Sequence, residues 1–196
     1  MARLAAGQIQ QQPARLMEML MTRLNVTCIV MAALTLLAGT ARADGGSYSL
    51  DQGFVNFSAP PEWPVIMQKT EGNPQFIAFQ VKDPADTNSG EATRVTVETK
   101  LLDDSGNFQS MVNVGLDKAK QTPGYEQRTD GVDPSVLRYF ALNGKTRYEY
   151  RETWYLNGHV MVHARCARPM LAATTAQWTA EYEKGCAQII QSLKPH

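Results

Sequence analysis

Two Asn-Gly dipeptides, each set between runs of alternating apolar and polar residues, constrain the fold of this chain most strongly. Asn143-Gly144 separates residues 135–142 from residues 146–156, and Asn157-Gly158 separates the latter run from residues 159–166. Both central positions of a type I′ turn need positive φ, which Asn and Gly tolerate, so this dipeptide is a strong hairpin signal. The sequence therefore predicts three consecutive antiparallel strands over residues 135–166.

Further strands and two helices complete the pattern. The first helix is predicted over residues 108–119, where apolar side chains recur three and four positions apart, and it ends before Pro123-Gly124. The second opens at Thr174-Thr175-Ala176-Gln177, which has capping-box spacing. Short alternating runs bounded by turn residues predict strands at 54–59, 65–69, 76–81, 93–102 and 125–129. We expect one α+β domain at 44–196, an antiparallel sheet of about six to eight strands flanked by two amphipathic helices.

Residues 1–43 have the features of a secretory signal peptide. Val26 to Gly39 is an apolar run of 14 residues, too short to span a hydrocarbon core of about 30 Å. Arg23 precedes this run, and Ala41-Arg42-Ala43 follows it with small residues at the first and third positions. We expect cleavage before Asp44 and a periplasmic or secreted protein; an uncleaved anchor is the disfavoured alternative.

The start of this leader is unusual. The twenty residues before Met21 are longer than a typical n-region, whereas a conventional signal peptide begins at Met21 itself. We therefore expect the true start at Met21, or at Met17 or Met19.

Charge limits the partners of the processed chain. The 19 basic and 19 acidic residues become 15 and 18 once the arginines and the single glutamate of residues 1–43 are removed, a net charge of about −3. A mildly acidic domain has no electrostatic reason to bind nucleic acid or anionic lipid. We expect no nucleic-acid partner and no stable membrane insertion after cleavage.

Cys166 and Cys186 are the two cysteines that remain after processing. An oxidising compartment favours their pairing, and the sequence predicts a structural disulfide. The alternative is a redox-active or nucleophilic thiol, but catalytic pairs usually have C-x-x-C spacing, which is absent here.

Catalytic and metal motifs are not found. The sequence has no G-x-S-x-G elbow, no G-x-G-x-x-G and no P-loop. His159 and His163 lie four residues apart on a predicted strand, about 13 Å, which is too far for one zinc ion. We therefore expect no metal, no cofactor and no enzymatic activity.

The last hairpin supplies the candidate binding surface. With Asn157-Gly158 as the central pair of the turn, Leu156 faces His159, Glu152 faces His163 and Tyr150 faces Arg165. Aromatic residues with Arg are typical of protein interfaces. The predicted surface consists of Tyr150, Glu152, Trp154, His163 and Arg165. The alternative is that these aromatic side chains are core beneath the first helix, with Glu152 and His163 as a local pair.

The other face of the hairpin should lie under the C-terminal helix. It carries Val160, Val162 and Ala164 together with Cys166, which has to reach Cys186. The same face also carries Arg147, Glu149 and Arg151, which conflicts with an apolar covered surface.

The chain resembles the PsbP/DcrB-like superfamily, which includes the Mog Ran-binding proteins. The resemblance rests on the order of elements, the Pro60-Pro61-x-Trp63 entry, the late hairpins and the closing Ile-Ile-Gln-Ser-Leu-Lys of 189–194. It implies a compact docking module without a shared enzymatic activity, as in photosystem accessory subunits, envelope proteins and chaperones for secreted toxins. The chain lacks the lipobox cysteine of the DcrB-like lipoproteins.

These observations favour an exported, non-enzymatic protein-binding module of the bacterial cell envelope, with another envelope or secreted protein as its partner. A periplasmic immunity protein that neutralises a secreted toxin is the second hypothesis. A small hydrolase that uses His163 with Glu152 is the third.

Overall fold

Antiparallel strands dominate residues 46–87, 92–130 and 133–194, which are those that the computed structural model describes. The expected signal peptide and part of the polar loop at 83–90 lie outside these ranges. One sheet has seven strands in the order β3-β4-β5-β9-β8-β7-β6, and every neighbouring pair is antiparallel. Its strands are β3 (Val65–Lys69), β4 (Gln75–Val81), β5 (Thr93–Leu101), β6 (Glu126–Arg128), β7 (Leu137–Asn143), β8 (Thr146–Asn157) and β9 (Val160–Pro169). The predicted α+β class and strand number are confirmed.

A second, two-stranded sheet was not predicted as such. It pairs β1 (Gly46–Leu50) with β2 (Val55–Ala59), and a short 3-10 turn, η2 (Asp51–Gly53), joins them. Only the β2 segment had a strand pattern, because β1 alternates serine with larger residues and has no β-branched residue.

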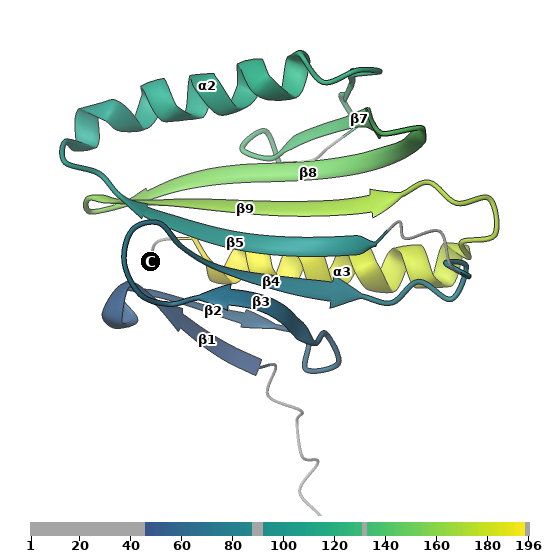
Figure 1. Ribbon diagram of the computed structural model, residues 1–196, viewed down its shortest axis with the longest axis horizontal. Helices are drawn as coiled ribbons and strands as arrows, with labels where there is room; N and C mark the ends of the chain where they lie inside the picture. Colours follow the sequence, from purple (N-terminus) through teal and green to yellow (C-terminus); the bar gives the residue numbers. More distant parts are fainter. Residues whose placement is uncertain (1–45, 88–91, 131–132, 195–196) are drawn as a thin grey trace, which may run out of the picture. The chain divides into compact units, whose positions relative to one another are not determined.

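The two helices lie on opposite faces of the large sheet (Figure 1). Helix α3 (Ala176–Ser192) packs Tyr182, Cys186 and Ile189 against β2 and β9, on what we call the α3 face. Helix α2 (Phe108–Lys120) follows the short turn η3 (Ser105–Asn107) and covers the opposite side, the α2 face. Ala119 is the one buried residue of α2, so this helix buries much less of itself than α3 does.

Both Asn-Gly dipeptides form hairpins, but one position away from the predicted turn. Asn143 pairs with Thr146 and Asn157 pairs with Val160, so the loop residues are Gly144-Lys145 and Gly158-His159. The two glycines have φ of 62° and 59°, whereas neither Lys145 nor His159 has positive φ. A glycine with positive φ at the first loop position is the pattern of a type II′ turn, in which Asn belongs to the strand.

Helix α3 begins one residue later than predicted. Thr175 is its N-cap, and its hydroxyl accepts a hydrogen bond from the Trp178 N–H. Thr174 instead donates its hydroxyl to buried Asp83, with 2.6 Å from Oγ1 to Oδ2. Asp83, the first residue of the polar loop, is therefore hydrogen-bonded to the residue that precedes the N-cap of α3.

A close contact between Trp63 and Gly185 fixes α3 against the entry to the sheet. Trp63 is buried and stacks on Tyr182, with ring centroids 6.0 Å apart. A Cβ added at Gly185 would lie 2.4 Å from Trp63 Cζ2 and 2.8 Å from Pro60 Cγ. The absence of a side chain at Gly185 is what allows the indole to lie directly on the helix.

Candidate functional site

The five residues predicted as a binding surface share the α2 face, on β8 and β9. We call Tyr150, Glu152, Trp154, His163 and Arg165 the Arg165 surface. The predicted opposite pairs are wrong: Trp154 faces His163, Glu152 faces Arg165, and Leu156 faces Met161. The turn begins one residue later than expected on the chain, and this moves each partner by two residues while keeping every side chain on its face.

Glu152 is the centre of the Arg165 surface. Its carboxylate is buried, and Oε1 accepts a hydrogen bond from Tyr139 Oη at 2.5 Å. His163 Nε2 lies 2.7 Å from Oε2, and Arg165 Nε lies 3.3 Å from Oε1. The predicted pairing of Glu152 with His163 therefore exists, but it runs diagonally across the two strands.

Tyr139 is a member of this site that the sequence reasoning missed. It lies on β7 opposite Tyr150, next to the row that holds Glu152. The Asn143-Gly144 hairpin was the signal that could have placed it, because the register of that hairpin determines which β7 side chains lie beside Glu152.

The pKa values of Glu152 and Tyr139 reflect this arrangement. Burial alone would raise the pKa of Glu152, but the hydrogen bond from His163, the charge of Arg165 and the Tyr139 hydroxyl together lower it. Burial is the main cause of a raised pKa at Tyr139, and the Glu152 charge adds to it. Glu152 is thus held as a carboxylate and Tyr139 as a neutral hydrogen-bond donor.

The five residues of the Arg165 surface differ in their exposure. Tyr150 and Glu152 are buried, as the core alternative requires, and Tyr150 stacks on Tyr139 beneath α2. Trp154 and His163 are half-buried and stack with ring centroids 4.8 Å apart. The side chain of Arg165 is 44% exposed, with its guanidinium 4.6 Å from the Tyr150 ring centre.

Helix α2 approaches this surface through Gly115. A Cβ added there would lie 3.0 Å from Trp154 Cζ2, so the indole edge lies against the helix backbone. Only one edge of Trp154 is covered in this way. The Arg165 surface is consequently a mixed arrangement: a core part under α2 and an accessible part formed by Trp154, His163 and Arg165.

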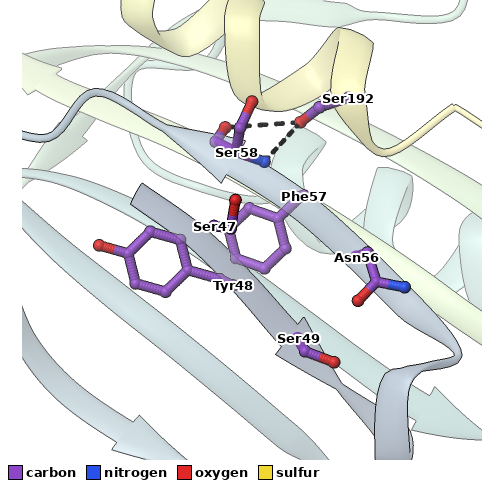
Figure 2. A pocket seen from close by; sticks show the side chains of 7 residues that line it. All are labelled: Ser47, Tyr48, Ser49, Asn56, Phe57, Ser58 and Ser192. Carbon is purple, nitrogen blue, oxygen red and sulfur yellow. Dashed lines mark hydrogen bonds between the residues drawn. The ribbon is translucent and has the colours of Figure 1, made fainter. Parts of the chain in front are cut away.

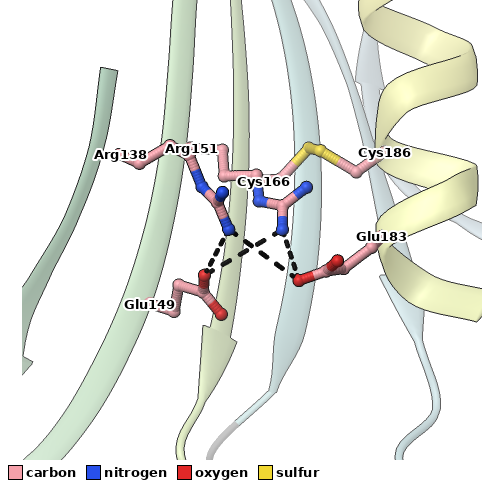
Figure 3. The surroundings of a disulfide bond; sticks show 6 residues. All are labelled: Arg138, Glu149, Arg151, Cys166, Glu183 and Cys186. Atoms are coloured by element: carbon pink, nitrogen blue, oxygen red, sulfur yellow. Dashed lines mark hydrogen bonds and ion pairs between the residues drawn. A yellow bond between two sulfur atoms is a disulfide. The ribbon is translucent and has the colours of Figure 1, made fainter. Parts of the chain in front are cut away.

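Of the three charged residues that conflicted with a covered α3 face, Glu149 and Arg151 belong to an ion-pair network beside α3 (Figure 3), and Arg147 pairs separately with Glu126. Buried Glu149 accepts a hydrogen bond from Arg168 Nε at 2.8 Å and pairs with Arg128, and Arg138 lies 3.3 Å away. Burial alone would raise the pKa of Glu149, but the surrounding arginines lower it. Each charge that sequence analysis could not place is therefore compensated by a neighbour.

The network joins α3 to the sheet at the same place as the cysteine pair. Glu183 of α3 pairs with Arg151 of β8, and Cys166 lies opposite Arg151 on β9. The structure joins Cys166 and Cys186 with a Cα–Cα distance of 6.3 Å, within the usual range for a disulfide. Figure 3 shows both links side by side.

A shallow hollow of about 410 Å³ lies between the β1–β2 sheet and the end of α3 (Figure 2). Hydroxyl groups dominate it, and the Ser58 N–H donates to Ser192 Oγ at 3.1 Å. Its lining is Ser47, Tyr48, Ser49, Asn56, Phe57, Ser58 and Ser192. These groups can hydrogen-bond to a ligand but contain no carboxylate, histidine or thiol for acid–base catalysis.

Within 46–87, 92–130 and 133–194, no group of three His, Cys, Asp or Glu side chains is placed to hold a metal ion. In the same part of the chain, no helix has both the length and the apolar character needed to cross a membrane.

Comparison with known proteins does not assign a family. No family model and no curated protein matches the sequence. A crystal structure from Bacteroides thetaiotaomicron VPI-5482 aligns with 78% of this chain at 11% identity and a TM-score of 0.44; this chain spans about half of it, 49%. LpqN of Mycobacterium tuberculosis, described as involved in cell envelope biogenesis, aligns with 77% of this chain and 84% of its own at 9% identity and a TM-score of 0.45. The resemblance to the PsbP/DcrB-like superfamily stays a prediction from the sequence.

Proposed function

We propose that the chain is an exported, non-enzymatic protein-binding module of the bacterial cell envelope, and that it binds its partner through the Arg165 surface. Export rests on the signal-peptide pattern of residues 1–43 and on a cysteine pair suited to an oxidising compartment. The partner is another envelope or secreted protein.

The observation that carries this proposal is the fixed but accessible state of Arg165. Its guanidinium is held by Glu152 and lies over Tyr150, while nearly half of the side chain stays exposed. A side chain already held in one position loses less conformational entropy when a partner binds it. Arg and Trp are also the residue types that most often contribute large shares of binding energy at interfaces.

The absence of enzymatic activity is part of the proposal. A hydrolase built on His163 and Glu152 would need a nucleophile within reach of the imidazole. The geometry places other groups there: His163 Nε2 lies 2.7 Å from Glu152 Oε2, and the imidazole stacks on the Trp154 ring. This arrangement supports a recognition role for the pair.

Affinity capture from envelope extract tests the proposal. We expect the exported protein to retain a defined set of envelope proteins and the Arg165→Ala variant to lose them, with its melting temperature nearly unchanged. Lys145→Ala, an exposed change in the β7–β8 turn, is the matched control and should capture normally. Equal capture by the wild-type protein and the Arg165→Ala variant would show that this surface is not the binding site.

A further inference from the structure

The α2 face continues past the Arg165 surface into a region that no described segment covers. Helix α2 approaches this face over β7 and β8, at Tyr139, Tyr148 and Trp154. On β3, β4 and β5 the same face carries exposed Met67, Gln80 and Arg94. In strand register, Glu98 of β5 lies opposite His163, and Thr96 lies opposite Arg165. The open region is therefore continuous with the Arg165 surface.

Three basic side chains lie on this open region, and we call them the basic face: Lys69 of β3, and Arg94 and Lys100 of β5. None of the three forms an ion pair within the described ranges, whereas Arg128, Arg138, Arg151 and Arg168 of the α3 face all do. Glu98 is the acidic side chain among them, which leaves a local excess of positive charge on a domain whose overall excess is negative.

We infer that the basic face binds an acidic segment of the protein partner; this inference rests on the proposed function and specifies its partner. Arginine and lysine side chains on one side of an otherwise acidic domain attract a surface of opposite sign and speed its encounter. Met67 is 56% exposed and half-buried Phe76 lies opposite Glu98, so apolar contacts accompany the charges.

Helix α2 makes a protein the favoured partner over a membrane surface. A packed α-helix is about 10 Å thick, and α2 lies on the same face as the basic side chains. A flat bilayer that rested on α2 would be held away from the sheet by more than the Debye length of about 8 Å at physiological salt. A protein segment can instead lie on the strands beside the helix.

Binding of a labelled poly-L-glutamate peptide to the exported protein, followed by fluorescence anisotropy, tests this inference. We expect binding that weakens as salt is raised to about 0.15 M. The double variant Arg94→Glu, Lys100→Glu should weaken binding at least about tenfold, because it replaces two attractions with two repulsions. The double variant Lys145→Glu, Lys184→Glu makes the same charge change at exposed positions outside the basic face and should bind as wild type.

The outcomes separate this inference from the proposed function. Equal affinity of the two double variants for poly-L-glutamate, or preferential binding to phosphatidylglycerol vesicles, would overturn the acidic-segment inference. If the capture of envelope proteins still depended on Arg165 in that case, the proposed binding module would stand. If the capture of envelope proteins did not depend on Arg165 while peptide binding still depended on Arg94 and Lys100, the role of the Arg165 surface as the binding site would be overturned instead.

Discussion

Glu152→Gln is the substitution that tests most directly how the Arg165 surface is held together. The change keeps the shape of the side chain but removes the charge that attracts Tyr139, His163 and Arg165. A hydrogen bond to a buried charged group contributes about 1.5–3 kcal/mol, which applies to the Tyr139 contact. The His163 and Arg165 contacts are partly exposed and contribute about 0.2–1 kcal/mol each. Because the amide oxygen of Gln can still accept one bond, we expect a loss of about 2 kcal/mol.

Urea denaturation at neutral pH measures this loss, with Glu98→Gln as the matched control. Glu98 is on the same sheet face and forms no ion pair within the described residues, so its replacement should stay within about 0.5 kcal/mol of wild type. A Glu152→Gln variant as stable as Glu98→Gln would refute the assigned role of Glu152.

The pH dependence of the same variant gives a second test. The fold lowers the pKa of Glu152 below its ordinary value of 4.5. The stability that the carboxylate supplies is therefore fully present above that value and is lost as the pH falls through the lowered pKa. The stability difference between wild type and Glu152→Gln should be constant near neutral pH and shrink in acid; a difference that grows in acid would contradict the lowered pKa.

Three further stability predictions follow, each measured by urea denaturation. Gly185→Ala should destabilise by about 1–3 kcal/mol although Ala favours helix, because its Cβ would lie 2.4 Å from Trp63; a stabilised variant would contradict this packing. Replacing Cys166 and Cys186 by Ser should cost about 3 kcal/mol for a sequence separation of 20, and free thiols in the exported protein would exclude the disulfide. Trp154→Ala should cost about 2 kcal/mol, less than the 3–5 kcal/mol of a full core position, because the indole is half-buried; a loss above 4 kcal/mol would mean that Trp154 is core.

Local patterns were sufficient to predict most of the fold. The hairpins, the alternation of β5 and the helical period of residues 108–119 each depend on residues close in sequence, and each element was predicted within about three residues of its bounds. Strand β1 was not predicted, because its own residues give no indication that it pairs with β2. The turn positions were also predicted wrongly. An Asn-Gly dipeptide is compatible with more than one turn type, and the turn type determines the register of the hairpin.

The sequence predicted which residues form the candidate site, but not how these residues contact one another. All five residues of the Arg165 surface share a face because side chains alternate along a strand, and because the predicted and observed loops both have two residues. Their contacts depend on β7, which brings Tyr139 to Glu152, and on α2, whose path over the sheet is a long-range property. The ion-pair network of Glu149 was missed for the same reason, since its arginines come from β6, β7, β8 and β9.

Photo-crosslinking in the producing cell tests the central claim, that this face of the sheet binds an envelope protein. A photoreactive residue replaces Thr96, which lies opposite Arg165, and in a separate strain Lys184, which lies on α3. We predict a discrete crosslinked protein of the envelope from position 96 that disappears with Arg165→Ala, and no such product from position 184. Equal crosslinking from both positions, or none from position 96, would contradict the account.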